Sequence, residues 1–299
     1  MSEGYNAQSG ADFTIILFFY VGRNEPAVSR LITNSLTTSY NHPMTSRERS
    51  FRLEAVVLRH LDWGEADRML TLFTAEQGKV RAVAKGVRKM RSRKAGHLEP
   101  FTRVNLLLAR GRDMLLITQA ETVDAFLALR DDLLRTTQAL YVIELLDRFT
   151  YEEGENHALY RLLVETLSRL AQADFNSDLV LRYYEIRLLD LVGFRPQLFR
   201  CLNCEEEIIA QDQYFSAERG GVLCPRCGRI VLEARPVTID TLRYLRHFQR
   251  SNWSEASRAP LPTPLNRELE ILMQYYLTYL LERGLNTPTF LRRIRRDWS

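Results

Sequence analysis

The four cysteines of this chain form two Cys-x2-Cys pairs, Cys201 with Cys204 and Cys224 with Cys227, separated by nineteen residues. This spacing is typical of four-cysteine zinc sites, in which two backbone turns deliver four thiolates to one tetrahedral ion. Because four protein ligands leave no position for water or substrate, the pattern predicts a single structural zinc ion. We expect Gly228, directly after Cys227, to permit a tight turn in the second pair.

Four ordinary buried thiols are the simplest alternative to a metal site. Three other uses of the cysteines are also open, and each fits the sequence less well. Two disulfide bonds would need an oxidising compartment, and we expect no export signal in this chain. A redox Cys-x-x-Cys pair more often stands alone beside a βαβ pattern. A zinc deaminase needs an open zinc position and a nearby His-x-Glu motif, whereas His97 and Glu99 lie more than a hundred residues before Cys201.

The histidines provide no recognisable catalytic arrangement. None lies within helical reach of another, and no serine elbow or Gly-x4-Gly-Lys-Ser/Thr phosphate loop accompanies them. We therefore expect no catalytic activity. The histidines are His42, His60, His97, His157 and His247.

The net charge of +4 is unevenly distributed along the chain. Residues 1–43 and 129–299 each carry −1, whereas residues 44–128 carry +6, from sixteen basic and ten acidic side chains. Between Lys79 and Arg112, eleven Lys or Arg accompany a single acid, Glu99. A basic segment between nearly neutral ones predicts a polyanionic partner such as nucleic acid.

The basic segment is densest at residues 88–94, where five cations occupy seven positions. Mutual repulsion predicts an exposed loop there, and a merely solvated loop is the alternative to a binding one. Trp63 and Phe101 are either base-stacking residues or parts of a core or turn. We expect phosphate contacts from Arg81, Lys85, Arg88, Lys89, Arg91, Arg93, Lys94, Arg103, Arg110 and Arg112.

Short β-prone runs precede and follow this loop. In residues 79–85 a period of two places Val80, Ala82 and Ala84 on one face, and three cations with Val83 on the other: Lys79, Arg81 and Lys85. Short strands punctuated by turn residues, with cations on a strand and a loop, are typical of the OB barrel. The predicted strands cover residues 53–58, 69–74, 79–85, 103–108 and 115–118.

Beyond residue 124 the apolar period becomes helical. We expect a first helix over residues 129–145, a second over 159–170, and a third that begins at a Ser177 cap and ends at Gly193. Further helices are predicted over residues 242–248 and 269–280, the last ended by Gly284 and Pro288, with a non-helical linker at 259–264.

The sequence therefore predicts an α+β fold. An extension over residues 1–48 precedes an OB barrel over 49–125, and an all-α domain in two parts, 126–200 and 233–299, carries a zinc-binding module over 201–232.

The extension contains an apolar run at residues 13–21 that is too short to span a bilayer. Its first twelve residues contain acids but no Lys or Arg, unlike a secretory signal. We expect a cytoplasmic protein without a membrane contact. The extension itself is an added strand, a disordered segment, or the result of a start codon assigned before Met44.

Several motifs resemble the RecO family. They are Gly-Glu-Ala-Asp-Arg at 64–68 followed by Leu-Thr-Leu-Phe-Thr at 70–74, Gly-Lys-Val-Arg-Ala-Val-Ala-Lys-Gly-Val-Arg-Lys at 78–89, Gly-His-Leu-Glu-Pro-Phe at 96–101, Gly-Phe-Arg-Pro at 193–196, and Phe215 with Gly220 and Gly221 before Cys224. The resemblance covers residues 51 to the carboxyl terminus and has no counterpart for residues 1–43.

The resemblance implies an OB domain, a helical domain and a zinc-binding insertion whose ligands here are Cys201, Cys204, Cys224 and Cys227. RecO-like proteins of the RecF pathway bind single- and double-stranded DNA without sequence preference and anneal complementary strands. They act at the nucleoid with RecR to load RecA onto DNA coated by single-strand binding protein (SSB), whose acidic carboxyl-terminal tail they engage.

One alternative of another class remains: a zinc-ribbon transcription or RNA-processing factor that reads a defined nucleic-acid site. Two further basic groups could extend a DNA path, receive the acidic tail, or be solvated helix faces. They are Arg243, Arg246 and Arg250, and Arg292, Arg293, Arg295 and Arg296.

Overall fold

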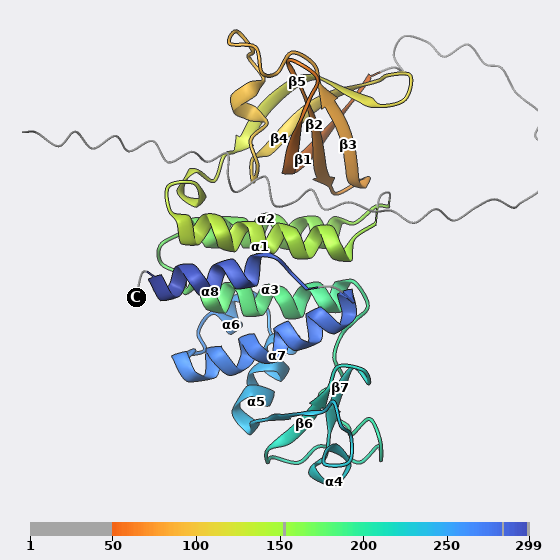
Figure 1. Cartoon of the computed structure of the whole chain (residues 1–299), viewed down its shortest axis with the longest axis vertical. Helices are drawn as coiled ribbons and strands as arrows, with labels where there is room; N and C mark the ends of the chain where they lie inside the picture. Colours follow the sequence, from red (N-terminus) through yellow and green to blue (C-terminus); the bar gives the residue numbers. More distant parts are fainter. Residues whose placement is uncertain (1–49, 152–153, 283, 298–299) are drawn as a thin grey trace, which may run out of the picture. The chain divides into compact units, whose positions relative to one another are not determined.

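Five strands form a closed barrel in the amino-terminal part of the described chain (Figure 1). The computed structural model describes residues 50–151, 154–282 and 284–297, so the predicted extension over residues 1–48 lies outside it. The strands neighbour one another in the order β1-β2-β3-β5-β4, the β3–β5 pair being parallel and the others antiparallel. This barrel confirms the predicted OB-like architecture. The strands are β1 (Ser50–Trp63), β2 (Asp67–Thr74), β3 (Gly78–Ala84), β4 (Arg103–Arg110) and β5 (Leu115–Asp124).

The period of two in β3 divides its side chains between the barrel interior and the outer face. Val80, Ala82 and Ala84 are buried, as predicted, and Arg81 is exposed. Lys79 shares the outer face with Arg81 but is not offered to solvent, because it contacts a carboxylate of the helical part.

The described chain after the barrel is mainly helical, which confirms the α+β class. None of the helices within the described ranges is long and apolar enough to cross a membrane. The prediction that Leu129 belongs to the first helix was wrong: it lies in a 3-10 turn (Leu127–Leu129) before that helix. The helices are α1 (Leu133–Phe149), α2 (His157–Ala171), α3 (Ser177–Leu191), α4 (Pro225–Gly228), α5 (Ile239–Arg250), α6 (Trp253–Ala256), α7 (Thr263–Leu281) and α8 (Thr287–Asp297).

The two ends of α3 show one correct and one wrong prediction. Its N-cap is Asn176, whose side chain accepts hydrogen bonds from the backbone N–H of Asp178 and Leu179, so Ser177 is the first helical residue and not the cap. At the other end Gly193 has φ +85°, as predicted, and the next N–H donates to the Leu189 carbonyl at 2.8 Å.

The predicted boundaries of the last helices were wrong in three places. Helix α7 begins at Thr263, so Pro264 belongs to its first turn, where a missing N–H costs nothing, and not to the linker. It ends at Leu281 with Glu282, rather than Gly284, in the left-handed conformation. Pro288 is the second residue of a further helix, α8, that the sequence pattern did not reveal.

Two carboxylates, the half-buried Glu54 and the buried Glu144, hold the barrel and α8 against the other helices. Glu54 of β1 accepts bonds from Arg103 and from the hydroxyl of Tyr160 in α2, at 2.8 Å for the latter. Glu144 of α1 accepts hydrogen bonds from the backbone N–H groups of Asn286 and Thr287, at 2.9 and 3.0 Å. These bonds satisfy donors at the start of α8 that have no partner within the helix.

A third carboxylate, Glu185 of α3, is fully buried in the helical core. Its Oε1 accepts a 2.6 Å hydrogen bond from Tyr141, and its Oε2 lies 3.0 Å from Arg182 without hydrogen-bond geometry. Burial raises the pKa of Glu185 to about 7, although Arg182, Tyr141 and Arg295 act in the opposite direction. The buried ion pair therefore compensates incompletely for the loss of water.

We predict that Glu185 makes the protein less stable as the pH rises from 5 to 7. The folded state keeps a proton that the unfolded chain releases above its ordinary pKa of 4.5, so increasing pH favours unfolding. Glu185→Gln cannot titrate and should lose about 1 kcal/mol less per pH unit in this window. Urea unfolding of both proteins across the pH series measures this difference, and parallel stability curves would contradict it.

Candidate metal centre and nucleic-acid interface

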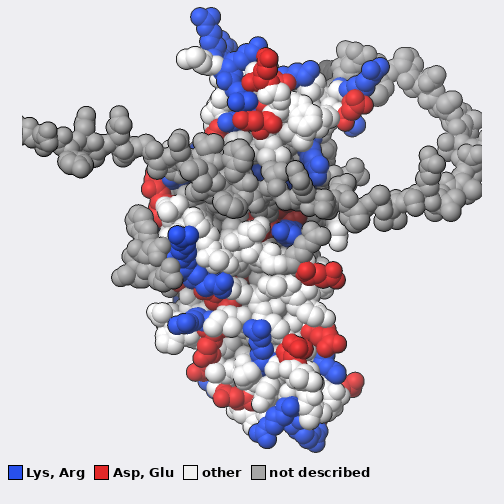
Figure 2. Space-filling view, in the orientation of Figure 1, with Lys and Arg blue, Asp and Glu red and all other residues white. Residues whose placement is uncertain are grey.

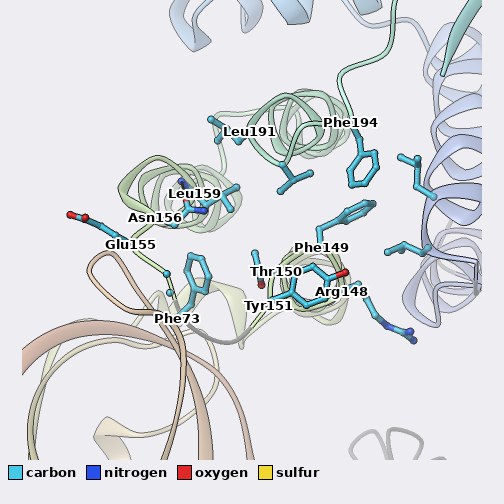
Figure 3. Close-up of a pocket in the computed structure, with 15 residues that line it drawn as sticks. Phe73, Arg148, Phe149, Thr150, Tyr151, Glu155, Asn156, Leu159, Leu191 and Phe194 are labelled. Carbon is cyan, nitrogen blue, oxygen red and sulfur yellow. Dashed lines mark hydrogen bonds between the residues drawn. The ribbon is translucent and has the colours of Figure 1, made fainter. Parts of the chain in front are cut away.

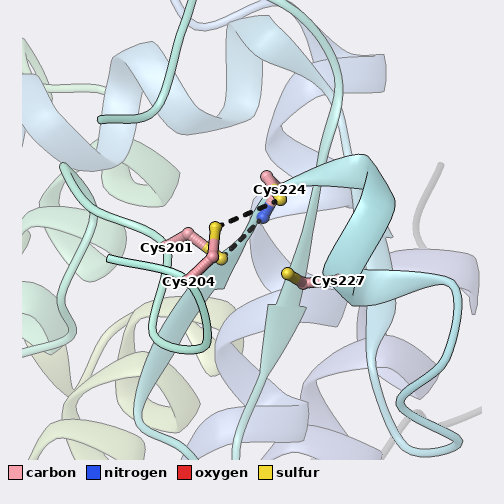
Figure 4. Close-up of side chains that lie close together, drawn as sticks. All are labelled: Cys201, Cys204, Cys224 and Cys227. Carbon is pink, nitrogen blue, oxygen red and sulfur yellow. Dashed lines mark hydrogen bonds between the residues drawn. The ribbon is translucent and has the colours of Figure 1, made fainter. Parts of the chain in front are cut away.

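The four cysteine side chains converge on one point (Figure 4). Their Sγ atoms all lie within 4.8 Å of one another, and those of Cys204 and Cys224 are 3.8 Å apart. Four sulfurs about 2.3 Å from a central zinc form a tetrahedron with edges of about 3.8 Å. Because all four are free thiols, the arrangement fits one four-coordinate metal ion.

Each cysteine pair is shaped by its own backbone. In the first, Glu205 takes a left-handed φ of +61°, and its N–H donates to the Cys201 carbonyl at 2.9 Å. The second pair spans the short helix α4, without positive φ at Gly228. The prediction that Gly228 permits a turn was therefore wrong: a Cβ there would lie 2.3 Å from the Tyr214 side chain, so the glycine permits close packing.

Backbone and side-chain N–H groups point at the sulfurs. The N–H of Cys224 donates to the Cys201 sulfur at 3.3 Å, and the Asn203 amide donates to the Cys227 sulfur at 3.3 Å. Burial raises the pKa of Cys201, but the N–H groups of Cys204, Cys224 and Asn203 outweigh it and lower this pKa to about 6. These N–H groups favour a thiolate, the metal-binding form, at Cys201. The Glu206 N–H opposes the shift at Cys204, but burial and hydrogen bonds with neighbouring thiols raise the pKa of Cys204, and burial raises that of Cys224.

The cysteines lie beside a small sheet that α7 supports. The sheet has the order β7-β6-β8, formed by β6 (Gln213–Ser216), β7 (Gly221–Leu223) and β8 (Arg235–Val237), so it continues past residue 232. The Tyr275 hydroxyl of α7 donates to the Glu233 carbonyl at 2.6 Å and accepts from the Ala217 N–H at 3.2 Å. The ring centroids of Tyr276 and Phe215 are 5.2 Å apart.

The basic loop, residues 85–94, is held at both ends by two of its own cations. Arg88 donates to the Glu65 carbonyl at 3.3 Å and pairs with Asp62 at 3.3 Å, which ties the loop to the β1–β2 turn. Lys94 reaches the Ile117 carbonyl of β5 at 2.9 Å, and burial lowers its pKa. These two predicted phosphate contacts thus also have structural roles.

The other cations of the loop and of its neighbouring turn face solvent, and Figure 2 shows blue side chains projecting from the barrel at the top of the view. Arg110 is exposed beside the Phe51 ring, 5.7 Å from its centroid. Five more are exposed and form no hydrogen bond or ion pair through their side chains with other described residues: Lys85, Lys89, Arg91, Arg93 and Arg112.

Arg81 and Arg103 lie in different surroundings. Arg81 is exposed on the outer face of β3. Arg103 forms a two-point contact with Glu54, at 2.9 and 3.0 Å, in the junction between the barrel and α2. Its charge is therefore balanced within the protein, and a phosphate would have to compete with Glu54.

The two further basic groups also contact their own protein. Arg246 donates to the Leu198 carbonyl at 2.9 and 2.6 Å, and Arg250 lies 4.0 Å from the Phe199 ring centroid. Arg243 pairs with Asp240 at 3.2 Å. Arg295 pairs with Asp178 and Glu270, whereas the side chain of Arg296 is outside the described part.

The two aromatic candidates have opposite environments. Phe101 is 4% exposed and packs in the core, which excludes it as a stacking surface. Trp63 is 52% exposed at the end of β1. Trp63 is thus accessible to a base.

A pocket of about 500 Å³ lies where the β2–β3 region meets the helices (Figure 3). The rings of Phe149 and Phe194 are tilted by 56° with centroids 6.0 Å apart, and Arg148 and Glu155 are among the charged lining residues. Its described lining includes neither a cysteine nor a histidine. The pocket thus brings together none of the histidines considered for catalysis.

Two family models match most of the chain. Recombination protein O N terminal matches residues 48–126, and Recombination protein O C terminal matches residues 130–288. The chain belongs to the RecO family. The boundary between the two matches follows the last barrel strand and precedes α1.

The sequences of individual RecO relatives align with this chain over most of their length. The DNA repair protein RecO of Roseiflexus sp. is 39% identical over 249 residues, which are 83% of this chain and 87% of that protein. That of Pelotomaculum thermopropionicum is 37% identical over 247 residues, 81% of this chain and 94% of the relative. That of Dehalococcoides mccartyi strain CBDB1 is 35% identical over 250 residues, 84% and 98% respectively.

We predict that Gly228→Ala destabilises the cysteine site. The added methyl group would overlap the Tyr214 side chain, and either α4 or the ring must move, at a cost of roughly 1–3 kcal/mol. Gly96→Ala is a suitable control, since its Cβ would meet no atom within 4 Å. Urea unfolding measures both changes, and equal effects would contradict the packing role of Gly228.

Proposed function

We propose that this protein is a DNA repair and recombination mediator that binds single- and double-stranded DNA through its barrel. The observation that carries the proposal is a loop anchored by Arg88 and Lys94 that leaves other cations exposed. Such an arrangement on an OB-like barrel is suited to contact phosphates along a strand. Membership of a family whose relatives are named DNA repair protein RecO supports the same function.

Phosphate contacts would make the binding independent of sequence and sensitive to salt. Each contact releases condensed counterions, so affinity falls as salt rises. A protein that holds one strand through its phosphates also screens the charge that repels a complementary strand. Base pairing then provides the free energy of annealing, and no nucleotide hydrolysis or other catalytic step is required.

The proposed role includes partners that the family relationship suggests. We expect the protein to act with RecR in the cytoplasm, at the nucleoid, and to help load RecA onto single-stranded DNA coated by SSB. The acidic tail of SSB would be bound by a basic surface of this chain.

Zinc is the proposed ion at Cys201, Cys204, Cys224 and Cys227. Four thiolates are the ligand set of structural zinc sites, and the sulfur separations agree with zinc coordination. When bound, the ion would join the two cysteine pairs and stabilise the sheet between them, since metal binding contributes directly to the folding of small modules.

We predict that Lys89→Ala, Arg91→Ala and Arg93→Ala together weaken DNA binding. Removing three phosphate contacts should reduce the slope of log affinity against log salt by about 2 units on single strands. Fluorescence anisotropy with labelled oligonucleotides of mixed sequence across a salt series measures both quantities.

The matched control removes three exposed arginines outside the barrel, Arg229, Arg258 and Arg267. It changes the net charge equally but should leave the salt slope almost unchanged. Equal effects of the two triple variants would refute the loop as the binding surface. Binding confined to one defined sequence would instead support the site-specific factor.

We predict one zinc ion per chain and its loss in Cys224→Ser. The variant leaves three thiolates and should lower the free energy of unfolding by several kcal/mol. Elemental analysis of the purified proteins and thermal unfolding measure the two effects. A variant that keeps its metal content and stability would contradict the assignment.

A further inference from the structure

An apolar row crosses the outer face of the barrel. The pairing of β1, β2 and β3 aligns Leu61 with Met69 and Met69 with Val83, and the parallel pairing of β3 with β5 aligns Val83 with Leu116. The adjacent positions Leu70 and Ala82 belong to the barrel interior, so these four side chains lie on the opposite, outer face. We call them, with Trp63, the apolar row.

The apolar row lies on the part of the barrel face that the helices leave open. Closer to the helices, Phe73 packs in the helical core and Lys79 pairs with Asp147 at 2.8 Å. Leu61 is 45% exposed and Trp63 52% exposed, whereas Met69 and Leu116 are half-buried and Val83 between them is buried at 5% exposed. Large apolar side chains that remain in water on one surface mark a binding site more often than chance.

Cations border the apolar row on several sides. The β1–β2 turn that follows Trp63 holds the basic loop through Arg88, which places the start of that loop, including Lys85, beside the row. At the other end, Arg112 belongs to the β4–β5 turn, whose Gly111 lies against Leu116. Arg81 is exposed on the same face of β3, two residues before Val83.

We infer that the apolar row is a platform for unpaired bases and that it gives the protein additional affinity for single-stranded DNA. In this arrangement the phosphates contact the bordering cations, a base stacks on Trp63, and others rest on Leu61 and the half-buried Met69 and Leu116. The inference rests on the proposed function and adds to it the residues that distinguish single strands from duplex.

Single-stranded DNA fits this surface better than duplex does. The bases of a duplex are stacked and paired inside the helix, so their faces cannot reach a side chain on a convex strand surface. An unpaired base offers a flat face to Trp63, and base–aromatic stacking contributes without regard to sequence. The cations bind the phosphates of single strands and of duplex, whereas the apolar row contacts only the unpaired bases of single strands.

The experiment compares three ligands of equal length: an oligo-dT, an abasic strand with the same number of phosphates, and a mixed-sequence duplex. Fluorescence anisotropy gives the affinity of the full chain for each. Trp63→Ala should weaken oligo-dT binding about tenfold, while abasic and duplex binding change by less than about twofold. Leu61→Ser should act in the same direction, and Trp63→Phe should keep most of the affinity.

Tyr151→Ala is the matched control, because Tyr151 is 90% exposed and lies outside the barrel. It should leave all three affinities unchanged, and urea unfolding should show that the Trp63 and Leu61 variants remain folded. Equal losses on all three ligands, or no loss on oligo-dT, would refute the platform, and the latter result would indicate a protein partner. A wild-type chain that binds none of the ligands would refute the proposed function itself.

Discussion

The mutual repulsion of the cations in residues 85–94 is the constraint on which the surface of the barrel depends. Residues 88–94, with five cations in seven positions, cannot form a stable element by themselves. The chain holds them by two kinds of contact, Arg88 with Asp62 and backbone carbonyls, and Lys94 with a carbonyl of β5. Because both anchors belong to the loop, the remaining cations are fixed in position without being neutralised.

The helical domain determines which barrel cations remain available. Asp147 of α1 pairs with Lys79, and Glu54 pairs with Arg103 beside Tyr160 of α2. These carboxylates balance the cations that face the helices and have no equivalent beside Arg91 or Arg93 in the described part of the chain. The positive surface is thus formed by the barrel cations that do not pair with the carboxylates at the junction with the helices.

The sequence predicted features that depend on local pattern. The barrel strands, the cysteine cluster and the left-handed Gly193 follow from a period of two, a fixed spacing and a helix end. The sequence did not predict the features that depend on contacts between residues far apart in the chain. Gly228 is required by Tyr214, and α8 begins where Glu144, far away in the sequence, accepts its first N–H groups. No local pattern contains either contact.

The same limit applies to the candidate binding surface. Composition identified the basic segment, but Lys94 and Lys89 look equivalent in the sequence, and only the fold shows that Lys94 contacts Ile117. The apolar row is another such case. Leu61, Met69 and Leu116 come from three strands, and strand register alone places them together.

A surface made of cations and an apolar row would also favour release of the DNA once its strands have paired. Under the proposed function, an incoming complementary strand competes with the apolar row for the same base faces. Once pairing is complete, the contacts with Trp63 are lost, while the phosphate contacts persist and remain sensitive to salt. The duplex therefore lacks the stacking contacts that helped to hold the separate strands, so base pairing itself removes part of the free energy that retains the DNA.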